Sequence, residues 1–433
     1  MRAAVIASLL LLSASSCHSS ARELWTGPRI LVQPGSPVVV VWSVKYRNVA
    51  VHSPPGELFA KPVDSVQEIA LEATYQTLDV RTCQLGPAYR YPKSLEVFGW
   101  GTRPGELWIR RPDADGLEPL DGGARIPLGR APANVWSELP FVSVGMTKGQ
   151  GFLRIVDLSR RAMHEMPLAS DISVDTILPI RLGDQNLVGL GSGKDRGSLD
   201  VVVVPLEDGT WRAPVTTRFE ERPSGVQLLH GGTWLALPPN DWPGRSPPPK
   251  EPLALLIADV RSGDVVRRVE HQRMNQWALV ETNRLWFAHA VGGSCRRLEV
   301  VDLEADTRRE LPLPGCLIGL ERWRTGAPFL TIRMDYEGPY TQLVDLRSGR
   351  LTPVPRGTPD WSVLVGDAYF EIDDRRAVSG LDLVTGERWQ AVASAGRIAS
   401  ISAVPAARRM VLVNEQGSVL VYDVDARRVS KCM

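Results

Sequence analysis

The sequence predicts an all-β fold built from about eight copies of one four-stranded antiparallel sheet. Short apolar and β-branched runs recur along the chain, each ending in a turn such as the one within VDLRSGRLTPVP at Val344–Pro355. These turns return at a regular interval. Long amphipathic helical patterns are absent, while 38 Gly and 34 Pro punctuate the chain. Together these three observations favour repeated sheets over helices.

Each copy has the local chemistry of a β-hairpin. Alternating or β-branched runs flank a tight connection, and Gly or Asp-Gly supplies the positive φ that such a turn requires. The Asp before the turn can cap it through its side chain. A single hairpin is only marginally stable in water, so the copies must pack against one another.

The spacing of the copies predicts how they pack. The residues that open the turns are 112, 157, 205, 259, 302, 345, 382 and 423, so neighbouring turns lie 37 to 54 residues apart. An interval of about 40–45 residues is the period of one four-stranded blade of a β-propeller. We expect one propeller domain at 28–433 with eight blades. Seven blades is the alternative, and two stacked β-sandwiches would be the competing arrangement.

Strand-like runs also precede the first turn. Val38–Trp42 and Val49–Val51 are examples within residues 28–85. We expect these runs either to belong to the first blade or to help close the ring by pairing with the last one.

The repeated turn resembles the turn between the third and fourth strands of WD-type and quinoprotein-like propeller repeats. Asp382–Trp389, DLVTGERW, is most similar to the quinoprotein-like form, in which the Trp packs between blades. The resemblance covers roughly residues 100–433. It implies a propeller blade and carries no catalytic residue to this chain, because quinoprotein-like propellers include many that bind no quinone.

The first 17 residues, MRAAVIASLLLLSASSC, have the composition of an export signal. The apolar run Ala3–Leu12 is about half of the ~20 residues that a membrane-spanning helix needs. Ala14–Cys17 resembles the bacterial lipoprotein signal, which implies that Cys17 becomes a lipidated N-terminus. Cleavage after Ala21 to release a soluble protein is the alternative. With lipidation, residues 18–27 would form a tether to the membrane.

Four cysteines remain after Cys17, and an even number in an exported chain favours disulfides. Cys295 and Cys316 are symmetric about the point between Ala305 and Asp306, where the alignment places a turn. We therefore expect them to be bonded across one hairpin of one blade. Cys83 would then pair with Cys432, which is natural when the ends of the chain meet in a closed ring.

Composition and motifs argue against several classes of function. With a formal net charge of +1, the protein has no overall electrostatic field that would attract nucleic acid or anionic lipid. The six His are not spaced as metal ligands, and neither His-Glu-x-x-His nor Cys-x-x-Cys occurs. We expect no metal, cofactor or catalytic residue that the sequence alone can name.

Two loops are candidates for partner binding. Pro238–Pro252, PPNDWPGRSPPPKEP, coincides with the longest interval between turns and offers Trp242 and Arg245, which are residue types enriched at interfaces. The second is Met334–Tyr340, with Asp335, Tyr336 and Tyr340. A stiff surface connection is the simpler interpretation of the first loop.

The sequence thus favours an exported, lipid-anchored propeller that acts as a non-catalytic binding or scaffolding module of the bacterial envelope. We expect a monomer with an envelope protein as its partner, at the periplasmic side of the outer membrane rather than free in the periplasm. One specific form is an outer-membrane assembly lipoprotein. The alternative is an envelope enzyme (a hydrolase, lyase or quinoprotein-type enzyme) with its site at the channel mouth.

Overall fold

The computed structural model describes most of the chain beyond the N-terminal signal. It describes residues 22–432 apart from 26–28, 52–64, 93–95, 111–115, 128–140, 145–151, 159, 170–171, 173, 175, 179–184, 193–197, 220–225, 230–231, 239–252, 272–276, 283, 292–294, 323–326, 336–340, 355–360, 374–375 and 394. Cys17 therefore lies outside the described residues. In the described part, no helix is long and apolar enough to cross a bilayer.

The described residues form nine antiparallel sheets and one short 3-10 helix, η1 (Pro405–Ala407). The first sheet, called here the N-terminal sheet, contains β1 (Arg22–Trp25), β2 (Arg29–Val32), β3 (Val38–Val51), β4 (Ser65–Asp79) and β5 (Gln84–Tyr91).

The other eight sheets follow in chain order and are called here blades 1 to 8. Blade 1 has β6 (Glu96–Trp100), β7 (Leu107–Arg110) and β8 (Leu117–Pro119), and blade 2 has β9 (Phe141–Val144), β10 (Phe152–Asp157) and β11 (Ala162–Pro167). Blade 3 has β12 (Thr176–Ile177), β13 (Asn186–Ser192), β14 (Leu199–Glu207), β15 (Thr210–Trp211) and β16 (Val215–Phe219). Blade 4 has β17 (Gln227–Leu229), β18 (Trp234–Leu237), β19 (Leu253–Asp259) and β20 (Val265–His271).

The last four blades have four strands each. Blade 5 has β21 (Trp277–Glu281), β22 (Leu285–Ala290), β23 (Arg297–Asp302) and β24 (Thr307–Pro312), and blade 6 has β25 (Cys316–Arg322), β26 (Phe329–Asp335), β27 (Thr341–Asp345) and β28 (Leu351–Val354). Blade 7 has β29 (Ser362–Val365), β30 (Ala368–Ile372), β31 (Val378–Asp382) and β32 (Arg388–Val392), and blade 8 has β33 (Ile398–Val404), β34 (Arg409–Asn414), β35 (Val419–Asp423) and β36 (Arg428–Lys431).

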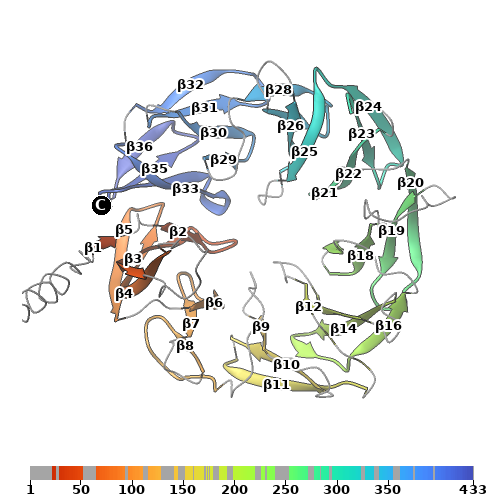
Figure 1. Ribbon diagram of the computed structural model, residues 1–433, viewed down its shortest axis with the longest axis horizontal. Coiled ribbons are helices and arrows are strands. Elements are labelled where there is room, and N and C mark those ends of the chain that lie inside the picture. Colours follow the sequence, from red (N-terminus) through yellow and green to blue (C-terminus); the bar gives the residue numbers. More distant parts are fainter. Residues whose placement is uncertain are drawn as a thin grey trace, which may run out of the picture.

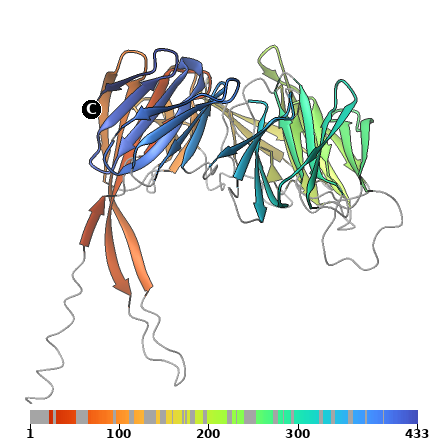
Figure 2. The same ribbon diagram turned by 90° about the horizontal axis from the view of Figure 1, so that it is seen from above.

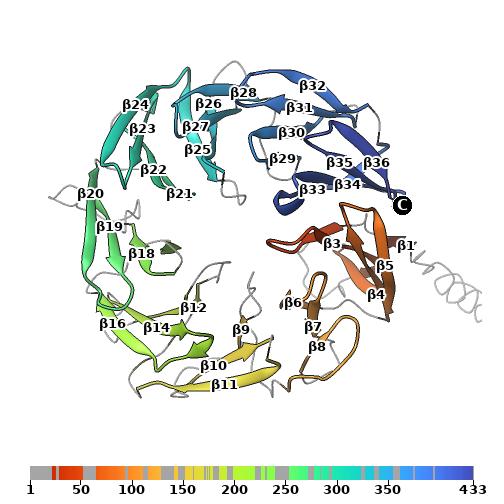
Figure 3. The ribbon, with the colours of Figure 1, turned by 180° about the vertical axis from the view of Figure 1, so that it is seen from behind.

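The protein is an all-β, eight-bladed β-propeller, as predicted. Each of the eight predicted turns falls in a different blade, and the blades follow one another around a ring (Figures 1 and 3). In blades 5 to 8 the first strand lies on the inner side of the ring and the fourth on the outer side. Buried apolar side chains fill the space between neighbouring blades, as in the cluster of Val363, Phe370 and Ile372 with Met410 and Leu412.

The N-terminal sheet lies in the ring between blade 8 and blade 1. One of its faces packs Val39 and Leu78 against Val411 of blade 8. The other face packs Val40 and Tyr75 against Ile109 and neighbouring residues of blade 1. We expected the strands before the first turn to join the first blade or to pair with the last one, and both expectations are wrong. These strands form a sheet of their own, held by side-chain packing on both faces.

The aspartates that open the turns cap them. The carboxylate of Asp382 accepts hydrogen bonds from the backbone N–H groups of Val384 (2.9 Å) and Thr385 (2.8 Å). Asp302 does the same for Glu304 and Ala305, both at 3.0 Å. This recurrent side-chain cap explains why an Asp precedes so many of the turns.

Arginine contacts place the turns of blades 5 to 8 on one face of the ring, called here the turn face. Arg309 donates to the carbonyl oxygen of Arg347 in the next blade (3.2 Å), and Arg350 donates to that of Val384 (2.9 Å). Arg427 then pairs with Glu387 at 2.7 Å. These contacts between successive blades give the arginines a structural role.

The turn face continues onto the N-terminal sheet. In blade 8, Arg409 at the start of β34 pairs with Asp423 at the end of β35 (2.7 Å). The same guanidinium donates to the carbonyl oxygen of Val80, directly after β4. The end of β4 therefore lies on the turn face, and the opposite end of the β3–β4 pair is Val51 with Ser65.

The N-terminal sheet carries an arm that projects from the ring. Strands β3 and β4 have 14 and 15 residues, and β5 accompanies β4 only as far as Ala73. Beyond that point β1 pairs with β3, with Arg22 opposite Asn48 and Trp25 opposite Lys45. Figure 2 shows this outer part of β3 and β4, with β1, projecting from one face of the ring, called here the arm face.

Candidate functional site

The inner strands of blades 5, 6 and 7 begin on the arm face. Trp277 at the start of β21 lies opposite His289, near the end of β22. Trp361, directly before β29, accepts a hydrogen bond on its carbonyl oxygen from the N–H of Ile372 at the end of β30 (2.9 Å). Since β30 starts opposite Asp382 on the turn face, its far end lies on the arm face.

Apolar side chains are exposed at these strand starts. Ile318 is 53% exposed and Trp361 is 44% exposed, while Trp277 is partly buried against the core between blades 4 and 5. The strands that carry or directly follow them, β21, β25 and β29, belong to three successive blades and lie on the inner side of the ring (Figure 1). Trp277, Ile318 and Trp361 are called here the inner-rim patch. Exposed apolar groups that include Trp are typical of protein-binding surfaces.

Ile318 is exposed because of a β-bulge. The register of β25 with β26 shifts between Leu317 and Gly319, so Ile318 has no residue opposite it. Leu317, one residue earlier, is buried. A Cβ at Gly319 would lie 3.2 Å from the Arg333 guanidinium, which leaves little room for a larger residue at the bulge. Bulges of this kind redirect a side chain at a sheet edge.

A disulfide lies beside the patch. Cys295 and Cys316 are bonded, with their Cα atoms 4.6 Å apart, which confirms the predicted pair. Its predicted location across one hairpin of one blade is wrong. Cys295 precedes β23 of blade 5, whereas Cys316 is the first residue of β25 in blade 6. The bond therefore joins two blades two residues before Ile318.

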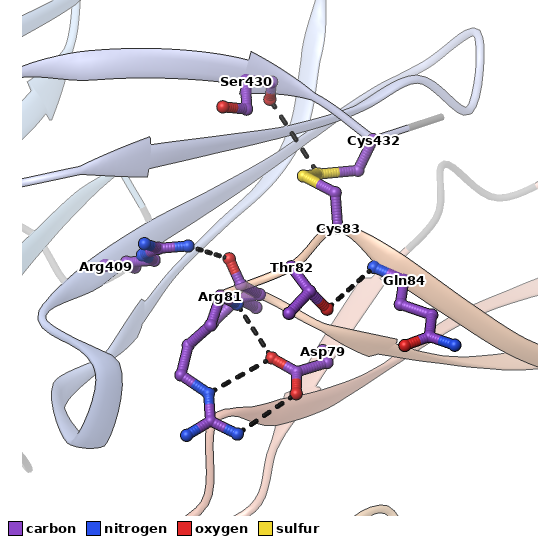
Figure 4. The surroundings of a disulfide bond; sticks show 9 residues. Asp79, Arg81, Thr82, Cys83, Gln84, Arg409, Ser430 and Cys432 are labelled. Carbon is purple, nitrogen blue, oxygen red and sulfur yellow. Dashed lines mark hydrogen bonds and ion pairs between the residues drawn. A yellow bond between two sulfur atoms is a disulfide. The ribbon is translucent and has the colours of Figure 1, made fainter.

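The second disulfide joins the two ends of the propeller, as predicted. Cys83, in the turn between β4 and β5, is bonded to Cys432, directly after β36, with Cα atoms 5.0 Å apart (Figure 4). The N–H of Cys432 also donates to the carbonyl oxygen of Val419 (2.9 Å). This link fixes the N-terminal sheet to blade 8.

Polar contacts support the rim next to Trp277. His289 is buried, and its Nε2 lies 2.7 Å from a carboxylate oxygen of Glu299. Arg308 lies 3.7 Å from the same oxygen. These contacts join β22, β23 and β24 behind the patch. In the part of the chain that the structure describes, no group of three or more His, Cys, Asp or Glu could hold a metal ion.

The loops chosen from the sequence connect strands that end on the arm face. Asp335, at the end of β26, is exposed and lies opposite Cys316. Tyr336 and Tyr340 lie outside the described residues. Trp242 and Arg245 also lie outside the described residues. Strand β18 starts opposite Asp259 on the turn side, so its end at Leu237 lies on the arm face.

Sequence reasoning missed the inner-rim patch. A strand with regular alternation would bury Ile318 or expose it according to a register that one sequence does not reveal. A usable signal was the position of Trp277 and Trp361 directly at the starts of first strands, where a side chain leaves the interface between blades.

No family model matches the chain, and no curated protein matches it. Solved structures do. Dihydro-heme d1 dehydrogenase NirN is 12% identical over 82% of this chain and 73% of its own, with a TM-score of 0.43. AztD from Citrobacter koseri is 11% identical over 90% and 93%, with a TM-score of 0.41. BamB from Moraxella catarrhalis is 11% identical over 75% and 95%, with a TM-score of 0.36. These similarities concern the fold alone.

Proposed function

We propose that the protein is an exported, lipid-anchored β-propeller of the bacterial envelope that binds a protein partner through the inner-rim patch. The observation that carries this proposal is the exposure of Ile318 and Trp361 on neighbouring inner strands. Apolar side chains at the centre of a rigid ring are suited to a protein surface, because they lose little conformational freedom on binding.

The covalent structure of the chain supports export. Both disulfides link separate sheets, so both contribute to the closed ring only in an oxidising compartment. The N-terminal segment that ends at Cys17 supports lipid anchoring of the exported chain. In this proposal the ring acts as a scaffold: it is held at the membrane, presents a partner-binding surface and catalyses no reaction.

The patch is tested by site-specific photo-crosslinking in intact envelopes. A benzophenone amino acid at Ile318 is expected to give one defined adduct with a partner protein. The matched control is the same amino acid at Val384, which is 61% exposed but lies in a turn of blade 7 on the turn face. Val384 is an exposed apolar residue like Ile318, but it lies on the opposite face of the ring.

Substitutions complete the test. Trp361→Ala is expected to abolish the adduct from position 318, and Trp361→Ala and Ile318→Asp are each expected to abolish co-purification of the same partner. Val384→Asp is expected to leave the adduct and the co-purification unchanged. Equal melting temperatures establish that the variants fold. Adducts that are the same from both positions, or capture of the partner that survives both patch substitutions, would contradict the proposal.

A further inference from the structure

The arm fixes where the N-terminus of the mature chain can be. Strand β1 runs antiparallel to β3, so the chain enters the fold from the tip of the arm: Arg22 lies opposite Asn48, three residues before the end of β3. The segment that we expect to act as a tether, residues 18–27, thus contains a strand of the arm. Only residues 18–21 separate Cys17 from the first described strand.

The reach of this short segment is limited. Arg22 is five residue steps beyond Cys17, and a fully extended chain of that length spans about 17 Å. Along β3, the nine residues from Asn48 back to Val39 span about 30 Å at the rise of a β-strand. Val39 lies near the turn face, because it pairs with Leu78, two residues before Val80. Cys17 therefore cannot reach the turn face.

We propose that the arm (β1 with the outer parts of β3 and β4) is the membrane-proximal stalk of the protein, and that it turns the arm face of the ring towards the bilayer that holds the Cys17 lipid. This inference rests on the proposed lipid anchor. The inner-rim patch lies on the same face, so the partner that it binds is embedded in the membrane or held at its surface.

The arm is suited to this role because it is paired. Its strands β1, β3 and β4 are joined by backbone pairing from Ser65 opposite Val51 inwards to the ring, with one β-bulge at Lys45–Tyr46. Three paired strands resist bending far better than the four-residue linker alone, so the stalk sets both the distance and the tilt of the ring. Figure 2 shows the arm and the ring seen from the side.

The test measures energy transfer from the protein to acceptor dyes in the membrane. With Cys17 lipidated and the other four cysteines in disulfides, an introduced cysteine is the only free thiol. Gln416 and Ala426 are a matched pair, since both are exposed in turns of blade 8. Gln416 follows β34 on the arm face, and Ala426 follows β35 on the turn face.

The purified lipidated chain, labelled with a donor dye at one of these positions, is placed in phosphatidylethanolamine and phosphatidylglycerol vesicles that carry a rhodamine lipid. The loss of donor emission is expected to be larger for Gln416→Cys than for Ala426→Cys. Equal or reversed losses would overturn the orientation, even with the chain fully bound.

A second tether separates this inference from the lipid anchor. A six-histidine tag placed directly before His18 binds the mature chain to vesicles that carry a nickel-chelating lipid. The same order of losses is expected there, because the arm fixes the geometry. A chain that binds vesicles only through the tag refutes the lipid anchor and the bilayer orientation that rests on it, while the order of losses still tests the stalk.

Discussion

Cys83 and Cys432 are bonded across the junction between the N-terminal sheet and blade 8, although 349 residues separate them in the chain. The bond lies where the two ends of the propeller meet, next to the hydrogen bond that Arg409 donates to Val80 (Figure 4). Elsewhere in the ring, neighbouring sheets are consecutive in the chain and are joined by a direct chain connection. The N-terminal sheet and blade 8 are the first and last sheets and have no such connection. Among the described residues, the ring closes through side-chain packing, the hydrogen bond from Arg409 and this disulfide.

We expect the double substitution Cys83→Ser/Cys432→Ser to lower the free energy of unfolding by about 2–5 kcal/mol, because the bond closes a very long loop of the unfolded chain. The measurement is denaturant unfolding without reductant. Cys295→Ser/Cys316→Ser is the comparison, with a smaller expected loss because its loop is short. A larger loss for the short loop would contradict the chain-entropy argument.

A second prediction concerns Trp389, which packs between blades 7 and 8. Its indole N–H donates to the hydroxyl of Tyr422 (2.8 Å), and its ring lies over Gly380 on the neighbouring strand. A Cβ at Gly380 would lie 2.3 Å from that ring. Gly380→Ala is therefore expected to displace Trp389 and to destabilise the protein by about 1–3 kcal/mol.

Thermal melting and the tryptophan fluorescence of the variant provide the measurement. Ser379→Ala is the matched control, since Ser379 is the exposed neighbour of Gly380 on the same strand. A Gly380→Ala variant that melts with the wild type would show that the junction between blades 7 and 8 can accommodate a methyl group.

The blades were predictable from the sequence because each turn is defined by residues that lie close together in the chain. An Asp cap and a residue with positive φ recur in the turns, as Asp382 and Gly386 (φ 81°) illustrate. In the turns of blades 2, 5 and 8 the residue with positive φ is Arg161, Asp306 or Arg427 instead of a Gly. The pairing of Cys295 with Cys316 was predictable, but the position of the bond between two blades was not. In blade 5 Arg297 pairs with Pro312 and Asp302 with Thr307, so the residue opposite Cys295 would be Pro314. The chain then leaves the hairpin, and Cys316 starts the next blade.

The candidate site and the arm depend on tertiary structure. The exposure of Ile318 follows from a bulge, and a single residue of register decides between core and solvent. The apolar runs before residue 85 identified strands, yet neither their length nor the position of β1 along β3 can be inferred from alternation alone. Those features are set by packing against blades 1 and 8.

The segment Pro238–Pro252, most of which lies outside the described residues, is predicted to be an exposed loop. Trypsin should cut the folded protein first after Arg245 or Lys250, because so many prolines exclude the loop from a sheet. Mass spectrometry of a short digest identifies the first cut. An initial cut in a hairpin turn, such as after Arg347, with the loop still intact would refute this prediction.

Cys17 is predicted to be the lipidated first residue of the mature protein. Cys17→Ala is expected either to move the protein to the soluble fraction or to leave its signal uncleaved. Membrane fractionation and the intact mass of the purified chain measure both outcomes. Normal processing together with unchanged membrane partitioning would contradict lipidation at this residue.

The final prediction concerns acid stability. The hydrogen bond from the Thr385 backbone N–H, followed by that from Val384, lowers the pKa of Asp382, while burial acts in the opposite direction. In Asp423 the bond from the Ala426 N–H has the same effect on the pKa. A folded-state pKa below the unfolded value of about 3.9 stabilises the fold above that pH. The stabilisation is lost as the pH falls through the folded pKa.

Asp382→Asn removes the charge and keeps a side-chain oxygen that can accept the turn's N–H groups. At pH 7 it is expected to lower the free energy of unfolding by about 1 kcal/mol. The difference from the wild type should begin to shrink below about pH 4 and disappear only below the lowered folded pKa of Asp382, where both side chains are neutral. Asp425→Asn is the matched control in an exposed pair with Arg408, where a smaller effect is expected. Urea unfolding across pH 3–7 measures both variants. A deficit of Asp382→Asn that stays constant down to pH 3 would show that the charge of the cap does not stabilise the turn.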